Sequence, residues 1–214
     1  MATTEKKITI PAMNLKHMDV RIVGDTPLIV HAWSEKAKRM MLEKQQKKAS
    51  AGKEARNPET EFADTLYWLT PKPEKLEGNW MKGARFGFPV TGIKKSAIEA
   101  SYQQGVVDKM TTLRGAFFIT GYNCDYIEIE GEGHPVIRED MVKIGMGTAD
   151  LRYRAMFEKW SALLHIEYNA NAISDEQIIN CLNCGGFCNG IGEWRPQRDG
   201  NFGRYHCESA TAEA

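Results

Sequence analysis

Residues 185–203 contain six glycines, in a length where the average usage of about 7% gives about one. Glycine adopts positive φ readily and lets another backbone or a ligand approach closely. The stretch therefore predicts either a bulged hairpin with tight turns or a loop that faces a ligand. Arg195, Arg198 and Arg204 lie within or beside it and can hold phosphates through paired hydrogen bonds. Trp194 can stack on a base.

The pattern of apolar residues and turn signals divides the rest of the chain into strands and helices. Predicted strands cover about residues 18–23, 27–33, 86–90, 115–121, 126–130, 154–168 and 187–207. Predicted helices begin at the cap Ser34, run over 61–69, follow a turn at Thr91-Gly92, and begin at the cap Ser174. Residues 46–59 are polar and basic, which predicts a loop, and residues 131–152 predict a protruding loop or hairpin.

Without its insertions, this order is strand, helix, strand, strand, helix, strand. The sequence thus predicts an α+β fold with a ferredoxin-like, RRM-like βαββαβ core. We expect residues 1–214 to form a single domain with insertions at about 34–82 and 131–152. Two helices would cover one face of the sheet, and the other face would be free, as in RNA-recognition modules of this topology.

Charge is unevenly placed along a chain whose net charge is zero. Residues 35–56 hold eight basic and three acidic side chains, which gives +5, and residues 125–140 hold six acidic and one basic side chain, which gives −5. Either run can be a solvated surface. Opposite patches on one chain also suit head-to-tail self-association, because complementary charges steer and register a contact.

Three stretches, GDTPLIVH, FPVTGIKKSAIEA and GIGEWRPQRDGNFGRY, resemble in this order the RAMP superfamily, the ferredoxin-like backbone subunits of CRISPR effector complexes. Gly190, Gly192, Gly200 and Gly203, with Arg195, match the glycine-rich loop of that family. Gly92 and Lys94 match its first turn more loosely. The size of the chain is similar to that of stand-alone RAMP-like proteins of phages.

The resemblance implies a subunit that stacks head to tail on a single RNA strand, which a thumb-like hairpin kinks. The 131–152 segment is where such a thumb would sit. No aspartate matches the family's cleavage loop, so we expect no enzymatic activity. The expected nucleic-acid-binding side chains are Lys44, Lys47, Lys48, Lys53, Arg56, Lys94, Lys95, Arg152, Arg154, Trp194, Arg195, Arg198 and Arg204.

The residues themselves favour single-stranded nucleic acid as the ligand but do not separate RNA from DNA, since every base has a stacking face and every strand has phosphates. The partners we expect are such a strand and further copies of the chain, without a membrane. The alternative is a self-assembling structural protein, for example of a phage particle, in which the same loop contacts neighbouring subunits.

The five cysteines allow two interpretations. Cys181, Cys184 and Cys188 have a spacing from which a metal could be bound, but His206 and Cys207 would point to opposite faces of a strand. We therefore expect packed thiols, no metal and no cofactor. The N-terminal stretch MATTEKKITIP lacks the apolar core of a signal peptide, so we expect a cytoplasmic protein, in the host cytoplasm if a phage encodes it.

Trp194 has two alternative roles if its segment is a regular strand. It would share a face with Gly190 and Gly192 and lie opposite Arg195. It then either fills the space that the glycines leave, within the core, or covers that space as a platform for a base.

Overall fold

An antiparallel sheet in the order β11-β1-β10-β5 forms the larger half of the fold, and β7 also pairs with β10. The computed structural model describes residues 12–47, 56–144 and 147–208. Its strands are β1 (Leu15–Gly24), β2 (Leu28–Val30), β3 (Tyr67–Trp68), β4 (Phe86–Pro89), β5 (Phe117–Thr120), β6 (Tyr126–Glu128), β7 (Glu130–Gly131), β8 (Val136–Ile144), β9 (Thr148–Phe157), β10 (Trp160–Asn169) and β11 (Tyr205–Cys207). Its helices are α1 (Glu35–Gln45), α2 (Pro58–Asp64), α3 (Val90–Gln103), α4 (Met110–Arg114), α5 (Asp175–Cys184), the π-helical turn η1 (Gly185–Asn189) and the 3-10 turn η2 (Pro196–Arg198).

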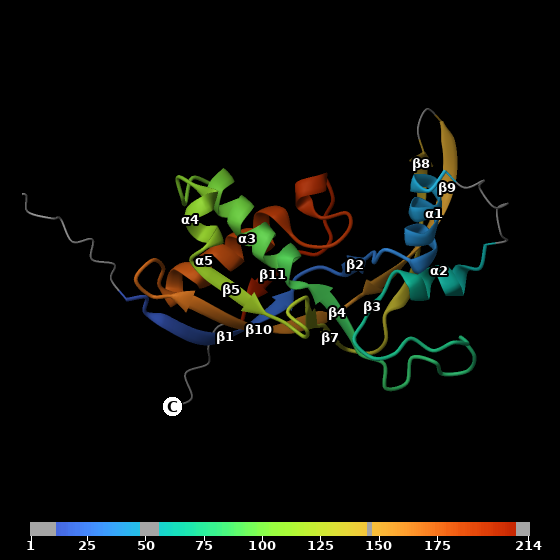
Figure 1. The fold of residues 1–214 in the computed structure, drawn as a ribbon, viewed down its shortest axis with the longest axis horizontal. Coiled ribbons are helices and arrows are strands. Elements are labelled where there is room, and N and C mark those ends of the chain that lie inside the picture. Colours follow the sequence, from blue (N-terminus) through green and yellow to red (C-terminus); the bar gives the residue numbers. More distant parts are fainter. Residues whose placement is uncertain (1–11, 48–55, 145–146, 209–214) are drawn as a thin grey trace, which may run out of the picture.

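This sheet has one buried face and one exposed face. Along β10 the side chains alternate, and Trp160, Ala162, Leu164, Ile166 and Tyr168 are buried. Strand side chains alternate between faces, so these five point to one side, the side that α3 and α5 cover in Figure 1. The chain order in this layer is β1, α3, β5, β10, α5, β11. The mixed α+β class predicted from the sequence is confirmed.

Local sequence signals explain both covering helices. In α5, the Ser174 hydroxyl accepts from the Gln177 amide while the Gln177 side chain accepts from the Ser174 amide, a complete capping box. In α3, Ile93, Ala97 and Ala100 are fully buried. The closest packing is between α3 and η1, where a methyl group on Gly185 would lie 2.7 Å from the Ala97 Cα atom. Small residues therefore bring the two helices together.

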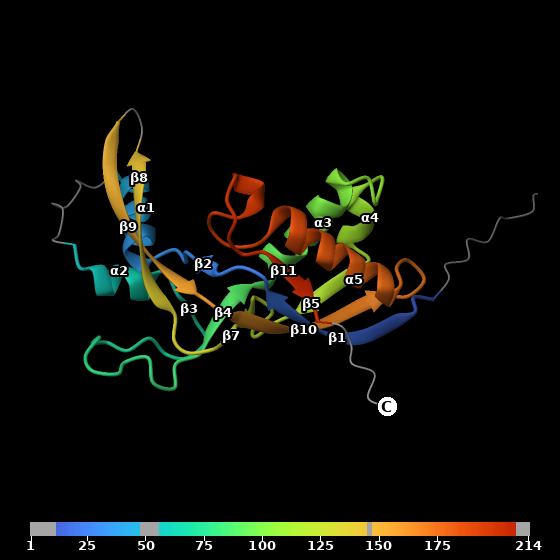
Figure 2. The ribbon, with the colours of Figure 1, turned by 180° about the vertical axis from the view of Figure 1, so that it is seen from behind.

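Two smaller sheets form the rest of the fold, in the orders β2-β9-β8 and β3-β4-β6. The long β8–β9 hairpin, within the segment predicted to protrude, projects at the end of the molecule opposite α4 and α5 (Figures 1 and 2). Helix α1 lies at this same end. It has no buried residue, although the predicted Ser34 cap is present, with the Ser34 hydroxyl 3.1 Å from the Ala37 amide.

Four element predictions are wrong in detail. The predicted 154–168 strand is two strands, because the chain turns at Glu158-Lys159 between β9 and β10. The predicted 61–69 helix ends at Asp64, and Tyr67–Trp68 is a strand. Helix α3 begins at Val90, so Thr91-Gly92 lies inside its first turn. In the predicted 187–207 strand only β11 is a strand, and the rest is the end of η1, the turn η2 and irregular backbone. Part of the expected 46–59 loop, residues 48–55, lies outside the described residues.

Gly186 is expected to be one of the least replaceable residues of the core. A Cβ atom there would lie 1.9 Å from the Tyr205 carbonyl oxygen, so Gly186→Ala must push β11 away from η1. We expect a loss of about 1–3 kcal/mol in the free energy of unfolding. The matched control is Gly115→Ala, where a Cβ atom meets nothing within 4 Å and should change stability by less than about 1 kcal/mol. Urea denaturation of both variants checks this, and equal losses would contradict it.

Candidate nucleic-acid interface

The glycine-rich loop, residues 190–204, is held by backbone hydrogen bonds to β2 and to the link that precedes it. The Glu193 amide donates to the Ile29 carbonyl at 2.9 Å, and the Gly203 amide donates to the Pro27 carbonyl at 2.8 Å. In the opposite direction, the Asp25 amide donates to the Arg204 carbonyl at 2.9 Å. Two segments far apart in the sequence are therefore joined through their main chains.

The glycines permit this contact because there is no room for side chains. Gly192 and Gly203 have φ of +78° and +67°, which other residues rarely adopt. A Cβ atom on Gly203 or on Gly200 would also lie 1.8 Å from a carbonyl oxygen, that of Ile191 or Trp194. The predicted loop glycines thus lie together, and the close approach that they allow is of one stretch of backbone to another.

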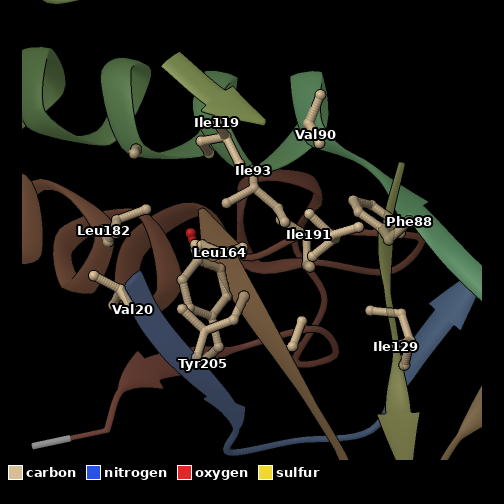
Figure 3. Packing of buried hydrophobic residues seen from close by; sticks show 14 of the residues in the cluster. Val20, Phe88, Val90, Ile93, Ile119, Ile129, Leu164, Leu182, Ile191 and Tyr205 are labelled. Atoms are coloured by element: carbon tan, nitrogen blue, oxygen red, sulfur yellow. The ribbon is translucent and has the colours of Figure 1, made fainter. Parts of the chain in front are cut away.

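A pocket of about 240 Å³ opens between this loop, the start of α3 and strands β3 and β4. The buried side chain of Ile191 anchors the loop and lies beside Ile93 and Phe88 in Figure 3. The polar and aromatic residues around the pocket include His31, Tyr67, Lys95, Glu99, Glu193 and Arg195. Thr91 and Gly92 bring the first turn of α3 to the same space.

The first turn of α3 has no side-chain cap. Pro89 occupies the cap position, and the turn has no acidic residue. The amides at a helix N-terminus carry a partial positive charge and attract anions. Because the helix begins at Val90, Lys94 and Lys95 lie in its second turn. The helix start therefore offers backbone donors to a ligand in the pocket.

Arg195 uses its guanidinium group within the protein. Its Nη1 donates to the Gly192 carbonyl at 2.9 Å, and its Nε and Nη2 both donate to the Gln197 side-chain oxygen at 3.1 Å. Gln197 Nε2 then donates to Glu99 Oε2 at 2.8 Å. This chain of hydrogen bonds connects the loop to α3 along one wall of the pocket. The guanidinium group of Arg195 is therefore engaged within the protein and fixes the shape of the pocket.

Glu193 is one of two acidic side chains that line the pocket. His31, whose Nδ1 lies 3.8 Å from Glu193 Oε1, has the largest effect in lowering the pKa of Glu193. Burial opposes the shift, and the charges of Arg154 and Arg195 add to it. The pocket therefore presents a carboxylate beside its backbone donors.

Trp194 is neither a core residue nor part of a regular strand. It has φ of +52° and is 41% exposed. Its indole Nε1 donates to Asp140 Oδ2 at 3.3 Å, which connects the glycine-rich loop to the β8–β9 hairpin. Both roles expected for Trp194 assumed a regular strand. The positive φ at Trp194 turns the backbone there, so Trp194 does not alternate with Arg195 as it would in a strand.

Asp140 is a buried carboxylate with two arginine partners. Arg154 Nη1 donates to its Oδ2 at 2.8 Å, and Arg138 Nε donates to its Oδ1 at 2.9 Å. Arg138 also lies over the ring of Phe202, 4.6 Å from its centroid, so a second contact connects hairpin and loop. Asp140 is 7% exposed. We refer to Arg138, Asp140, Arg154 and Trp194 as the hairpin latch.

The predicted basic residues fall into separate groups. Arg154 belongs to the latch, and its side chain is only 10% exposed. Arg56 and Arg152 both pair with Asp150 on the hairpin, at 2.6 and 3.0 Å. Arg198 is exposed on η2. Lys44 and Lys47 are exposed at the end of α1, whereas Lys48 and Lys53 lie outside the described residues.

Of the three remaining predicted residues, Lys94 and Arg204 lie over exposed aromatic rings. Lys94 donates to the Arg114 carbonyl at 2.8 Å and lies over the Phe118 ring, and burial lowers its pKa. Lys95 lines the pocket. Arg204 lies over the ring of Phe187, 4.9 Å from its centroid, and Phe187 is 66% exposed. The arginine and the ring together form a flat exposed surface.

The acidic 125–140 segment is largely compensated within the chain. Glu130 pairs with Arg21 at 2.5 Å and Glu132 with Lys159 at 2.7 Å. Glu128 forms a two-bond ion pair with Arg85. The segment therefore attracts the basic residues of a second copy less strongly than its net charge of −5 suggests.

The five cysteines are free thiols in this structure. Burial raises the pKa of Cys207 to about 12, and burial together with Cys188 raises the pKa of Cys184 to about 11. Among the described residues, no three side chains of the metal-binding types converge on one point. In the same part of the chain, no helix has the length and apolar character needed to cross a bilayer.

Comparison with known proteins finds similarity to solved structures but not to known sequences. No model of a protein family matches the chain, and no curated protein resembles it in sequence. The chain is similar to a structure titled "Crystal structure of Cmr6 from Pyrococcus furiosus", at 9% sequence identity and a TM-score of 0.42. The match covers 91% of this chain and 99% of that one. At this score the RAMP assignment stays a prediction.

Sequence reasoning missed Asp140, Arg138, Glu193 and Gln197. The acidic count over 125–140 included Asp140 but could not show that this carboxylate is buried between arginines from neighbouring strands. Glu193 had one available signal, because it stands between Gly192 and Trp194 in the glycine-rich loop.

Replacing the latch carboxylate should destabilise the protein. Asp140→Asn removes the counter-charge of Arg138 and Arg154, and loss of one partner from a buried ion pair costs about 3 kcal/mol. Glu139→Gln, at the exposed neighbouring position, should cost less than about 0.5 kcal/mol. Urea denaturation of both variants at pH 7 checks this.

The pH dependence of the stability of Asp140→Asn tests whether the stabilisation by Asp140 is ionic. Burial alone would raise the pKa of Asp140, but hydrogen bonds from Arg154 and Arg138 outweigh it and hold the pKa below its usual range. The stabilisation is thus present above the unfolded pKa of about 3.9 and is lost as the pH falls through the lower folded value. The gap between wild type and Asp140→Asn should narrow below about pH 4, and a gap independent of pH would contradict an ionic origin.

Proposed function

We propose that the protein binds single-stranded nucleic acid without acting as an enzyme, and that copies of it associate along the strand. The observation that carries the proposal is the uncapped start of α3, which lies at the rim of the pocket beside the glycine-rich loop. Backbone amides and a helix N-terminus are common contacts for phosphates. The proposal covers RNA and DNA alike, since stacking and phosphate contacts do not distinguish them.

Exposed aromatic side chains support this function. Phe187 is 66% exposed and carries the Arg204 guanidinium on its ring, and Trp194 is 41% exposed. Bases stack on such rings with little preference for sequence, and arginine adds a cation–π contribution. Phe187 lies on η1, just before the glycine-rich loop, and Trp194 lies within the loop.

Self-association is supported by apolar surface at the hairpin end. Met141 is 73% exposed on the hairpin, and α1 exposes Met40 and Leu42 without burying any residue. Isolated helices of this length are marginal in water, so α1 gains stability from packing against a partner. Contact between these surfaces of successive copies would build a filament. We further propose a stand-alone RAMP-like protein of the phage type, acting in the cytoplasm.

The same surface favours a second candidate function. A self-assembling structural protein, for example of a phage particle, would use the exposed apolar side chains of the hairpin and α1 without any nucleic-acid ligand. The absorbance ratio at 260 and 280 nm separates the two functions, because co-purified nucleic acid raises it. Electron micrographs with and without an oligonucleotide then show whether assembly depends on the strand.

Binding should be strongly dependent on salt. If about four to six phosphates are neutralised, the logarithm of the binding constant falls with the logarithm of the salt concentration at a slope near −0.7 per phosphate for single strands. Fluorescence anisotropy of a labelled oligonucleotide across a salt series measures the slope. A flat titration would exclude an electrostatic interface.

Phe187→Ala should weaken binding without unfolding the protein. The ring is mostly exposed, so its removal should change stability little, whereas the loss of one base stack costs about 1–3 kcal/mol of binding. Tyr102→Ala removes an aromatic side chain that is 47% exposed near the end of α3 and serves as the matched control. Equal affinities for the two variants would remove Phe187 from the interface.

A further inference from the structure

The pocket beside the glycine-rich loop is poorly suited to a phosphate as its occupant. The guanidinium of Arg195 is already hydrogen-bonded to Gly192 and Gln197, and Lys95 lies 3.6 Å from the Glu99 carboxylate. Glu193 and Glu99 both line the pocket. Two carboxylates repel a phosphate group that enters between them, so phosphates are better placed at the rim, near the start of α3.

The interior of the pocket instead suits a flat group that carries hydrogen-bond donors. Tyr67 and Phe88 supply an aromatic wall, and their ring centroids are 6.1 Å apart. The position of His31 is fixed in part by the Tyr67 hydroxyl, which donates to the His31 carbonyl at 3.3 Å. Glu193 is the acceptor on the loop side. Proteins bind an unstacked base by stacking it on an aromatic side chain and by forming hydrogen bonds to its edge. The aromatic wall and the Glu193 carboxylate can supply these two kinds of contact.

We propose that this pocket binds one nucleobase by its amino-bearing edge, with the Glu193 carboxylate as acceptor and guanine as the best-fitting base; this rests on the proposed single-strand binding. Guanine presents two neighbouring donors, N1–H and the N2 amino group, which match the two oxygens of a carboxylate. Adenine and cytosine present one amino group beside a ring acceptor. Thymine and uracil present a single N–H between two carbonyl oxygens, and these repel a carboxylate.

Glu99 forms a second wall of the pocket and does not select the base. Its Oε2 accepts from Gln197 at 2.8 Å, and its side chain is 26% exposed, whereas that of Glu193 is 41% exposed. The Arg195–Gln197–Glu99 chain therefore holds the width of the pocket, and Glu193 is the specificity-determining residue.

The test measures base preference at a single position. Oligo-dT of about 20 nucleotides is compared with the same strand carrying one central guanine, hypoxanthine, adenine or cytosine, and a uridine series does the same for RNA. One central guanine should tighten binding by roughly 5-fold or more relative to the parent strand, as expected for a paired contact to a base edge. Hypoxanthine, which lacks the N2 amino group, should fall between guanine and the parent.

The variant Glu193→Gln keeps the size of the side chain and replaces one acceptor oxygen by a donor. It should remove the guanine preference, so that strands with and without the central guanine bind with equal affinity. Glu132→Gln, at an exposed ion pair with Lys159 outside the pocket, is the control and should keep the preference. Urea denaturation of each variant verifies that it is folded.

The outcomes separate this inference from the function on which it rests. Tight binding of every strand with no base preference overturns the base pocket and leaves single-strand binding intact. A guanine preference that survives in Glu193→Gln overturns the role of Glu193. Binding of none of the DNA or RNA strands overturns both proposals.

Discussion

The contact of the glycine-rich loop with β2 and the link before it is the constraint on which the rest of this structure depends. It is made by main-chain atoms, with the Gly203 amide on the Pro27 carbonyl and the Glu193 amide on the Ile29 carbonyl. Backbone groups can approach this closely only where side chains are absent, and Gly192 and Gly203 meet that condition. The pocket, the indole of Trp194 and the carboxylate of Glu193 all take their positions from a loop fixed in this way.

The hairpin latch extends that constraint to the projecting end of the molecule. Asp140 accepts from arginines of two neighbouring strands and from the indole of the loop, so one buried carboxylate joins hairpin and pocket. The contact of Arg138 with the ring of Phe202 is a second connection between hairpin and loop. Asp140 is one of several acidic side chains of the 125–140 segment that already form ion pairs within the chain. The net charge of this segment is therefore a poor basis for predicting self-association.

The sequence predicted those parts of the fold that depend on local signals. Helix α5 has its capping box within four residues, and Ser34 caps α1 as expected. The α+β class followed from the order of such elements. The turn at Glu158-Lys159 was missed because apolar residues continue across it. The strand expected over 187–207 was wrong because positive φ at its glycines, and at Trp194, is imposed by segments distant in sequence. The glycine cluster lies in irregular backbone beside the pocket, but the partners of Asp140 and the acidic side chains of the pocket are brought together only by tertiary contacts.

Chain order also has a consequence for when the pocket forms. Arg204 bonds to the Thr26 hydroxyl across 178 positions of sequence, and β11 pairs with β1. Contacts of this separation have a high entropic cost of loop closure and tend to form late, and during synthesis they cannot form before residues 204–207 have been made. The sheet of β1, β10 and β5 can assemble before then, but the pocket cannot. A nascent chain can therefore form much of its core before the pocket exists.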